Sequence, residues 1–144
     1  SDLAESPVST PELTEQFPYV LTTGTRIPVF YNSEYRQLPQ LRRGNREPRV
    51  EMHPQTAARH GIVRGDWVVI STPHGSIRQR AHLTPDMHPE VIECQHGWWF
   101  PEREGWEHGI FESNANVLTS HKGACDPAMG SYQLRALLCR IDKA

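Results

Sequence analysis

The sequence has neither a long hydrophobic run nor an excess of charge of one sign. Its apolar stretches fall short of the ~20 residues that a membrane-spanning helix needs, so we expect no insertion into a membrane. The 15 Lys and Arg residues are balanced by 17 Asp and Glu residues, for a net charge of -2. This balance argues against a nucleic-acid-binding module held by bulk positive charge, and we expect no nucleic-acid partner.

Cysteine is scarce and provides no framework of disulfides or metal ligands. The chain has three cysteines, Cys94, Cys125 and Cys139, and no C-x-x-C pair. The eight histidines are scattered and include no H-E-x-x-H motif. Cys94 and His96 fall on one face of a predicted strand, but two ligands do not complete a zinc site. We therefore expect no bound metal ion and no catalytic triad in this chain.

The 144 residues are enough for one domain with its own hydrophobic core. Residues 1–17 are polar and contain Pro7 and Pro11, which predicts a linker or flexible tail. The domain itself is expected to span residues 18–144.

Short strands separated by turns are predicted along most of the domain, which indicates a mainly β barrel with short helices. One helix is expected over residues 54–60, because Pro54 suits its first turn and Gly61 can end it in a left-handed conformation. The predicted strands are Tyr19–Thr22, Val50–Met52, Trp67–Thr72, Ile77–Leu83, Val91–Cys94 and Leu134–Ile141.

The most informative stretch runs from Gly61 to Ile70. Gly65-Asp66 predicts a tight turn, because glycine tolerates a positive φ and the Asp side chain can accept from nearby backbone amides. Val68, Val69 and Ile70 then favour a strand. A helix, a Gly-Asp turn and a strand, in this order, resemble the Gly-Asp box of double-psi β-barrels.

Basic residues are concentrated in one short region, which contains Arg36, Arg42, Arg43, Arg46 and Arg49. Two interpretations stay open. The region is either a solvated basic loop or a contact surface for phosphates or an acidic protein.

Five segments resemble, in order, the C-terminal dinucleotide-binding domain of molybdopterin oxidoreductases of the dimethyl-sulfoxide-reductase superfamily. The Arg-Gln-Leu-Pro, Gly-Trp-Trp-Phe-Pro-Glu and Ser-Asn-Ala-Asn runs are most similar to its thiosulfate or polysulfide reductase and acetylene hydratase branch. Thr25 and Asn32 depart from the residues expected there. The segments are Leu21–Pro39, Val50–Pro54, the Gly-Asp box, Gly97–Glu102 and Ser113–Thr119.

The resemblance implies a double-psi β-barrel, of the aspartate-decarboxylase-like kind, that binds bis(molybdopterin guanine dinucleotide) with molybdenum or tungsten. Such a ligand needs hydroxyl and amide groups for its ring edges and cations for its phosphates. The cofactor-binding residues that it implies are Thr22, Thr23, Gly24, Thr25, Arg26, Tyr31, His96, Gly97, Trp98, Asn114, Asn116, Tyr132 and Gln133.

The residues taken alone leave plainer interpretations open. Thr22–Thr25 fits an ordinary turn at a strand end, and Asn114 and Asn116 fit a turn stabilised by their side chains. Trp98 is expected to offer an aromatic face to the ligand, and its plainer interpretation is a core tryptophan beside a glycine turn. Trp99, on the opposite strand face, is expected in the core.

The resemblance also implies that this chain caps the cofactor and performs no chemistry alone. Its expected partners are the other domains of a catalytic subunit and an iron–sulfur electron-transfer subunit, in the cytoplasm or periplasm of a bacterium or archaeon. Two alternatives share the barrel. One is a pyruvoyl-type decarboxylase, for which Gly75-Ser76 would be the self-cleavage site, and the other is a non-enzymatic substrate-adaptor barrel.

Overall fold

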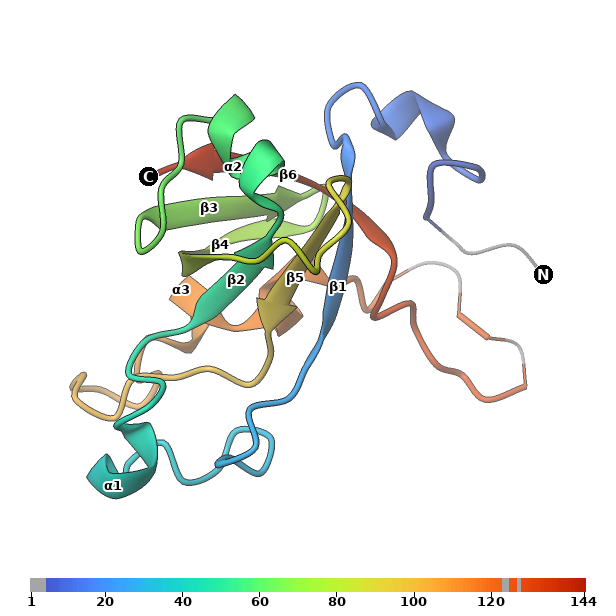
Figure 1. Ribbon diagram of the computed structural model, residues 1–144. Coiled ribbons are helices and arrows are strands. Elements are labelled where there is room, and N and C mark those ends of the chain that lie inside the picture. Colours follow the sequence, from blue (N-terminus) through green and yellow to red (C-terminus); the bar gives the residue numbers. More distant parts are fainter. Residues whose placement is uncertain (1–4, 123–124, 127) are drawn as a thin grey trace.

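The computed structural model describes residues 5–122, 125–126 and 128–144. Six strands close into one barrel, and the short helices lie in the connections between them or, in one case, before the first strand (Figure 1). Around the barrel the order is β1 (Tyr19–Thr25), β5 (Val91–Gln95), β2 (Arg49–Met52), β4 (Gly75–Leu83), β3 (Trp67–Thr72) and β6 (Leu137–Lys143).

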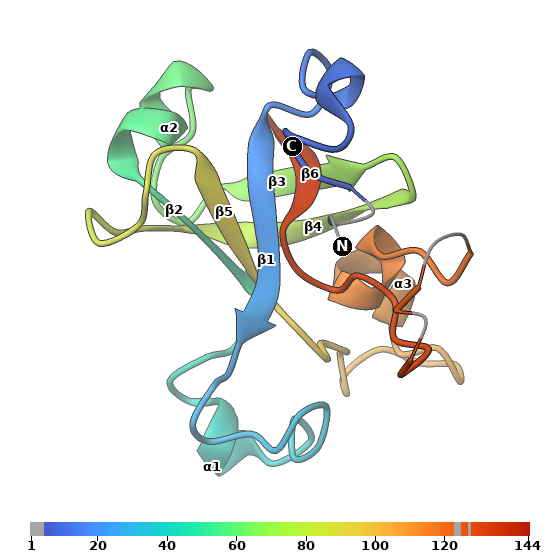
Figure 2. The ribbon, with the colours of Figure 1, turned by 90° about the vertical axis from the view of Figure 1, so that its right-hand side faces the viewer.

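The barrel mixes parallel and antiparallel pairs. β1 runs parallel to β5 and β2 runs parallel to β4, and each pair joins strands that are not consecutive in the chain. Parallel pairing requires such crossover connections. β6 closes the barrel by pairing with both β3 and β1, and Figure 2 shows β1 between β5 and β6. The prediction of a mainly β, double-psi barrel is confirmed.

The helices are short, and the described part of the chain has none that is long and apolar enough to cross a membrane. α1 and α3 lie in regions that the sequence left as loops. The helices are η1 (Pro11–Leu13), α1 (Pro39–Arg42), α2 (Pro54–Arg59), α3 (Ile110–Ser113) and η2 (Ala115–Leu118), where η marks a 3-10 helix.

The segment from α2 to β3 has the predicted helix, turn and strand. Gly61 has a φ of 62°, and the amides of Gly61 and Ile62 donate to the carbonyls of Ala58 and Ala57. This is the paired hydrogen-bond pattern of a glycine-terminated helix. In the turn that follows, Asp66 Oδ2 accepts from the Val63 amide at 2.9 Å. Lys143 Nζ lies 2.9 Å from the same oxygen, which ties the end of β6 to the turn.

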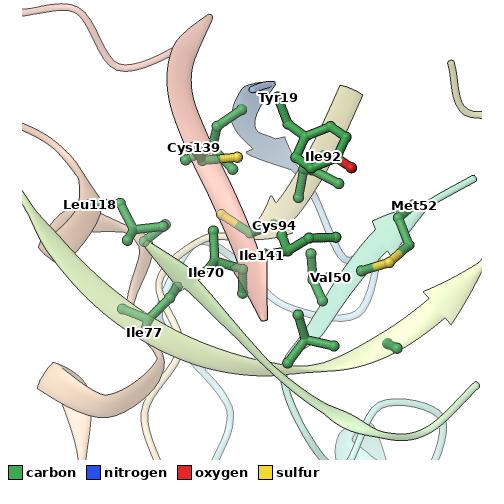
Figure 3. Close-up of a cluster of buried hydrophobic side chains, with 14 of the residues drawn as sticks. Tyr19, Val50, Met52, Ile70, Ile77, Ile92, Cys94, Leu118, Cys139 and Ile141 are labelled. Carbon is green, nitrogen blue, oxygen red and sulfur yellow. The ribbon is translucent and has the colours of Figure 1, made fainter. Parts of the chain in front are cut away.

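The core fills the barrel with side chains from the strands, and includes the fully buried Val50, Ile70 and Ile92 (Figure 3). Cys94 and Cys139 lie among these aliphatic side chains. Burial raises the pKa of the Cys94 thiol to about 12 and also raises the pKa of Cys139. Both thiols therefore stay protonated at neutral pH and act as small apolar groups.

The final strand begins at Leu137, three positions after the predicted start at Leu134. Ala136 has a φ of 59°, in the left-handed region, which interrupts extended backbone. The side-chain amide of Gln133 donates to the carbonyls of Arg135 and Ala136 and holds this conformation. These local hydrogen bonds of Gln133 thus override the apolar pattern that suggested an earlier start.

The described part of the expected N-terminal tail is attached to the barrel. The Glu5 amide donates to Gln133 Oε1 at 2.8 Å, and Gln133 Nε2 donates to the Glu5 carbonyl at 2.6 Å. The Glu5 carboxylate accepts from the Leu138 amide at 2.9 Å and lies 3.1 Å from His74 Nε2. These contacts join the segment before β1 to the start of β6, which a polar composition does not reveal.

We expect Asp66→Ala to lower Tm at pH 7. The hydrogen bond from the Val63 amide, followed by the contact with Lys143, lowers the pKa of Asp66 in the folded protein. A carboxylate with a lowered folded pKa stabilises the fold above its unfolded pKa of about 3.9, and this stabilisation is lost as the pH falls through the folded value. The Tm difference from the wild type should therefore shrink as the pH is lowered toward 3.

Thermal unfolding followed by circular dichroism between pH 7 and pH 3 measures this difference. Asp142→Ala is a suitable control, because this carboxylate is exposed and its contact with Arg140 is long, at 3.6 Å. A Tm difference for Asp66→Ala that stays constant with pH would show that the charge of Asp66 does not stabilise the turn.

Candidate functional site

Loops from distant parts of the chain meet at the end of the barrel where β1 and β5 finish (Figures 1 and 2). Thr23 Oγ1 donates to the Leu134 carbonyl at 2.6 Å. His96 Nδ1 lies 2.9 Å from the Thr25 carbonyl, and Asn114 Nδ2 donates to the Trp98 carbonyl at 3.3 Å. These bonds link stretches that contain or adjoin the predicted site residues. We call these stretches, residues 22–26, 96–98, 114–116 and 132–134, the rim.

Part of the rim encloses a cavity of about 120 Å³. Its lining includes the predicted residues Thr25, Arg26, Tyr31 and His96. Arg26 and Tyr31 are exposed, whereas Thr25 and His96 are half-buried. The cavity is also lined by Ile27, Phe30, Asn32 and Arg36, none of which was predicted as a site residue.

The hydrogen bond between His96 and Thr25 fixes how the neutral imidazole faces the cavity. A backbone carbonyl only accepts hydrogen bonds, so Nδ1 of His96 must carry the proton that it donates to Thr25. In the neutral ring, Nε2 is then an acceptor. Nε2 has no hydrogen-bond partner among the described residues, so it can accept a hydrogen bond from a ligand.

Arg36 is buried beside the cavity and connects the loop after β1 to the loop after β5. Its guanidinium carbon lies 4.5 Å from the ring centroids of both Phe30 and Trp98. Nε donates to the Gly97 carbonyl at 2.9 Å, and Nη2 lies 3.1 Å from the His96 carbonyl. Burial, and to a lesser extent the charge of Arg42, lowers the pKa of Arg36 to about 10, so it stays protonated at neutral pH.

Three buried polar atoms near the cavity have no hydrogen-bond partner within the described residues. They are Thr25 Oγ1, Arg36 Nη1 and Trp98 Nε1, and the residues Thr25 and Arg36 line the cavity. Buried polar groups in native proteins are nearly always paired, so unpaired ones call for an explanation. One explanation that fits these donors is a bound ligand with hydrogen-bond acceptors.

The prediction for the two tryptophans was wrong. Trp98 is completely buried, with edge-to-face contacts to Phe30 and Phe100, and so offers no face to a ligand. Trp99 is instead partly exposed, and its Nε1 donates to the Ser33 carbonyl at 2.5 Å. The reason is that β5 ends at Gln95, so the alternation of a strand does not continue through the tryptophans.

Gly97 was predicted as a point of close approach, and the structure identifies what approaches it. Its φ is 64°, and a Cβ here would lie 3.2 Å from backbone atoms of Asn32 and Ser33. Gly24 is similar, because a Cβ there would lie 2.9 Å from the guanidinium of Arg135. Arg135 was missed by the sequence analysis, although it follows Tyr132 and Gln133 closely in the chain.

The remaining predicted residues occupy other parts of the rim. Asn114 Oδ1 accepts from the Asn116 amide at 3.0 Å and caps η2, and the Asn116 residue itself is exposed. Tyr132 and Gln133 line a separate cavity of about 180 Å³, together with Glu5. Because the side chain of Gln133 already binds the Glu5 backbone, it is not free toward the first cavity. Thr22 is half-buried near the end of β1.

Across the described ranges, no group of three His, Cys, Asp or Glu residues is arranged to hold a metal ion. Cys94 is buried in the core, whereas His96 lies on the rim after β5 has ended.

A buried glutamine fixes two positions of the rim at once. Gln79 Nε2 donates to the Gln95 carbonyl at 2.9 Å and to the Ser113 carbonyl at 3.0 Å, and its Oε1 accepts from the Gln95 amide at 3.1 Å. Gln95 directly precedes His96, and Ser113 directly precedes Asn114. The amide of one side chain in β4 thus sets the spacing between two predicted site residues.

Comparisons with known proteins identify the family of the chain. Residues 19–137 match the family described as the molybdopterin dinucleotide binding domain. The dopamine dehydroxylase of Eggerthella lenta is 45% identical over 130 residues, which cover 90% of this chain and 13% of that protein. The acetylene hydratase of Syntrophotalea acetylenica is 29% identical over 136 residues, which cover 91% of this chain and 19% of that protein.

The fold is similar to a solved structure over its whole length. The acetylene hydratase from Pelobacter acetylenicus matches with a TM-score of 0.93 and 28% identity, covering 100% of this chain and 21% of that one. The chain therefore spans between 13% and 21% of the length of these relatives.

We expect Gln79→Leu to destabilise the fold and to disturb the rim. The change leaves the amide and carbonyl of Gln95 and the carbonyl of Ser113 without their partners. Because unpaired buried groups are costly, the free energy of unfolding should fall by about 2–5 kcal/mol. Urea unfolding measures the loss, and amide chemical shifts of His96 and Asn114 report the disturbance.

Gln55→Leu is the control, since this glutamine is exposed on α2. Equal stabilities for the two variants would show that the buried amide does not hold the rim.

Proposed function

Because the chain belongs to the molybdopterin dinucleotide-binding domain family, we propose that its rim binds bis(molybdopterin guanine dinucleotide) carrying molybdenum or tungsten. In this proposal the domain covers one side of the cofactor within a longer catalytic subunit. The bound metal centre would supply the redox or hydration chemistry. The chain's own residues would bind and orient the organic part of the cofactor and exclude water from it.

The cavity beside His96 fits the edge of a pterin or guanine ring. Such an edge carries N–H donors next to carbonyl and ring-nitrogen acceptors. His96 Nε2 offers an acceptor, whereas Thr25 Oγ1 and Arg36 Nη1 offer unused donors. The proposal that a ring edge binds here rests on one observation. Two donors without a partner lie beside an imidazole whose Nε2 is an acceptor, because its Nδ1 donates to Thr25.

Cations on the rim would serve the phosphates of the dinucleotide. Arg26 is exposed at the cavity, and the guanidinium of Arg135 lies over Gly24. Guanidinium groups form strong, charge-assisted hydrogen bonds with phosphate oxygens. Neither side chain forms a hydrogen bond or an ion pair within the described part of the chain.

The rest of the binding site is expected in other domains of the parent protein. A cavity of about 120 Å³ holds only part of a dinucleotide. The relatives are several times longer than this chain, since it covers 13% of one and 19% of another. We therefore expect the other domains of a catalytic subunit, and an iron–sulfur subunit, as partners, and no catalysis by this chain alone.

Neither alternative on the same barrel is supported. Gly75 and Ser76 belong to the hairpin of β3 and β4, where Ser76 Oγ donates to Ser71 Oγ at 2.8 Å. Gly75 also has a packing role, because a Cβ there would lie 2.6 Å from the Val117 carbonyl oxygen. A cleavage site is not needed to explain either residue, and the relatives above are not adaptors by name.

The test is a titration of the 144-residue chain with pterin, guanosine monophosphate and inorganic phosphate, followed by amide and imidazole chemical shifts. Pterin or the guanine nucleotide should shift the signals of Thr25 and His96. Thr25→Val and His96→Phe should each weaken this binding about tenfold, the equivalent of ~1.4 kcal/mol for one lost hydrogen bond.

His88→Phe serves as the control, because His88 lies in the exposed turn before β5. Shifts confined to the cavity of Tyr132 and Gln133 would contradict the assignment of the ring edge to His96.

A further inference from the structure

A second concave surface runs along β2 and β4 and adjoins the rim cavity at Arg36, which lines both. Two adjoining cavities of about 520 Å³ and 550 Å³ share Arg43, Arg46 and Glu47 in their lining. Seven of the chain's 15 Lys and Arg residues line them, against two of its 17 acidic residues. Apart from the buried Arg36, these basic residues form what we call the arginine groove: Arg42, Arg43, Arg46, Arg49, Arg64 and Arg80.

Among the residues that the structure describes, only two arginines of the groove pair with a carboxylate. Arg42 pairs with Glu102 at 2.6 Å, and Arg80 pairs with Glu47 through two hydrogen bonds of 3.0 Å. Glu47 and Glu102 are the only acidic residues that line the two cavities, and each already pairs with an arginine of the groove.

The other four arginines keep an uncompensated charge. Arg49 donates to the carbonyl of Gly44 at 2.7 Å, and Arg64 donates to a backbone carbonyl and lies beside His82. Carbonyls position a guanidinium without cancelling its charge. The side chains of Arg43 and Arg46 are exposed and have no hydrogen bond or ion pair within the described part of the chain.

The strands hold part of this charge in fixed positions. Arg49 and Arg80 face each other in the parallel pairing of β2 and β4. The guanidinium of Arg80 also lies 4.2 Å from the ring centroid of Trp67, a cation–π contact that restricts its rotamers. A groove with prearranged guanidinium groups binds anions at a lower entropic cost than flexible surface side chains do.

We propose that the arginine groove binds an acidic segment of a second polypeptide chain in an extended conformation. The two cavities adjoin at Arg43, Arg46 and Glu47, and their combined lining of basic residues suits several carboxylates better than one small anion. The pair of Arg80 with Glu47 shows that a carboxylate fits the guanidinium geometry there. Outside the groove acidic residues outnumber basic ones, which disfavours a long nucleic acid.

The test measures binding of a fluorescein-labelled hexaglutamate peptide to the 144-residue chain by fluorescence anisotropy. The double variant Arg43→Glu/Arg46→Glu should weaken binding at least tenfold. Neither side chain has an internal partner to lose, so the variant should keep the wild-type Tm. Arg43→Lys/Arg46→Lys retains the charge and should retain most of the affinity.

Arg59→Glu/Arg140→Glu is the matched control, because it makes the same change in net charge at exposed arginines elsewhere, on α2 and β6. It should leave the affinity within about twofold, since exposed charges beyond a Debye length are screened. An equal loss in both double variants would overturn the proposal. A competition experiment gives a second test. If inorganic phosphate or a single-stranded oligonucleotide, at equal charge concentration, displaced the labelled peptide as well as unlabelled peptide does, the proposal would also be overturned.

Discussion

A buried network of side-chain amides holds together the end of the barrel on which the site depends. Gln79 binds both the amide and the carbonyl of Gln95, and Gln95 in turn exchanges two hydrogen bonds with Asn45, of 3.2 Å and 3.0 Å. Gln95 Oε1 also accepts from the Arg49 amide at 2.9 Å. The network thereby joins β4, β5 and β2. Because hydrogen bonds are directional and costly to leave unmade in a buried site, it permits one arrangement of these strand ends.

Arg36 fixes the loops that follow these strand ends. A guanidinium between Phe30 and Trp98, with donors to the carbonyls of Gly97 and His96, fixes two long loops against each other without regular secondary structure. Gly97 belongs to the same contact between the two loops, since only a residue without Cβ allows the backbone of Asn32 to approach so closely. The cavity beside His96 therefore has walls of fixed shape, which a cofactor site needs for preorganised binding.

The same loops separate two kinds of surface. On the rim, the half-buried Thr25 and His96 and the buried Arg36 present individual hydrogen-bond donors and acceptors. On the other side of Arg36, guanidinium groups form the arginine groove. Binding there would depend on net charge more than on a pattern of hydrogen-bond donors and acceptors. Arg36 lines cavities of both surfaces, so the wall between them is one buried side chain. The proposed cofactor binding, which rests on membership of the molybdopterin dinucleotide-binding domain family, concerns the rim and not the groove.

The sequence by itself determined the elements that depend on local chemistry. Pro54 and Gly61 bounded α2, Gly65-Asp66 formed its turn, and ordered motifs indicated the family, because capping, turn geometry and strand propensity act over a few residues. Only the tertiary structure decided that Trp98 is buried, that Gln133 binds Glu5, and that Arg36 supports the site. These outcomes depend on partners many positions away in the chain, and no periodicity in the sequence encodes which buried donor meets which acceptor.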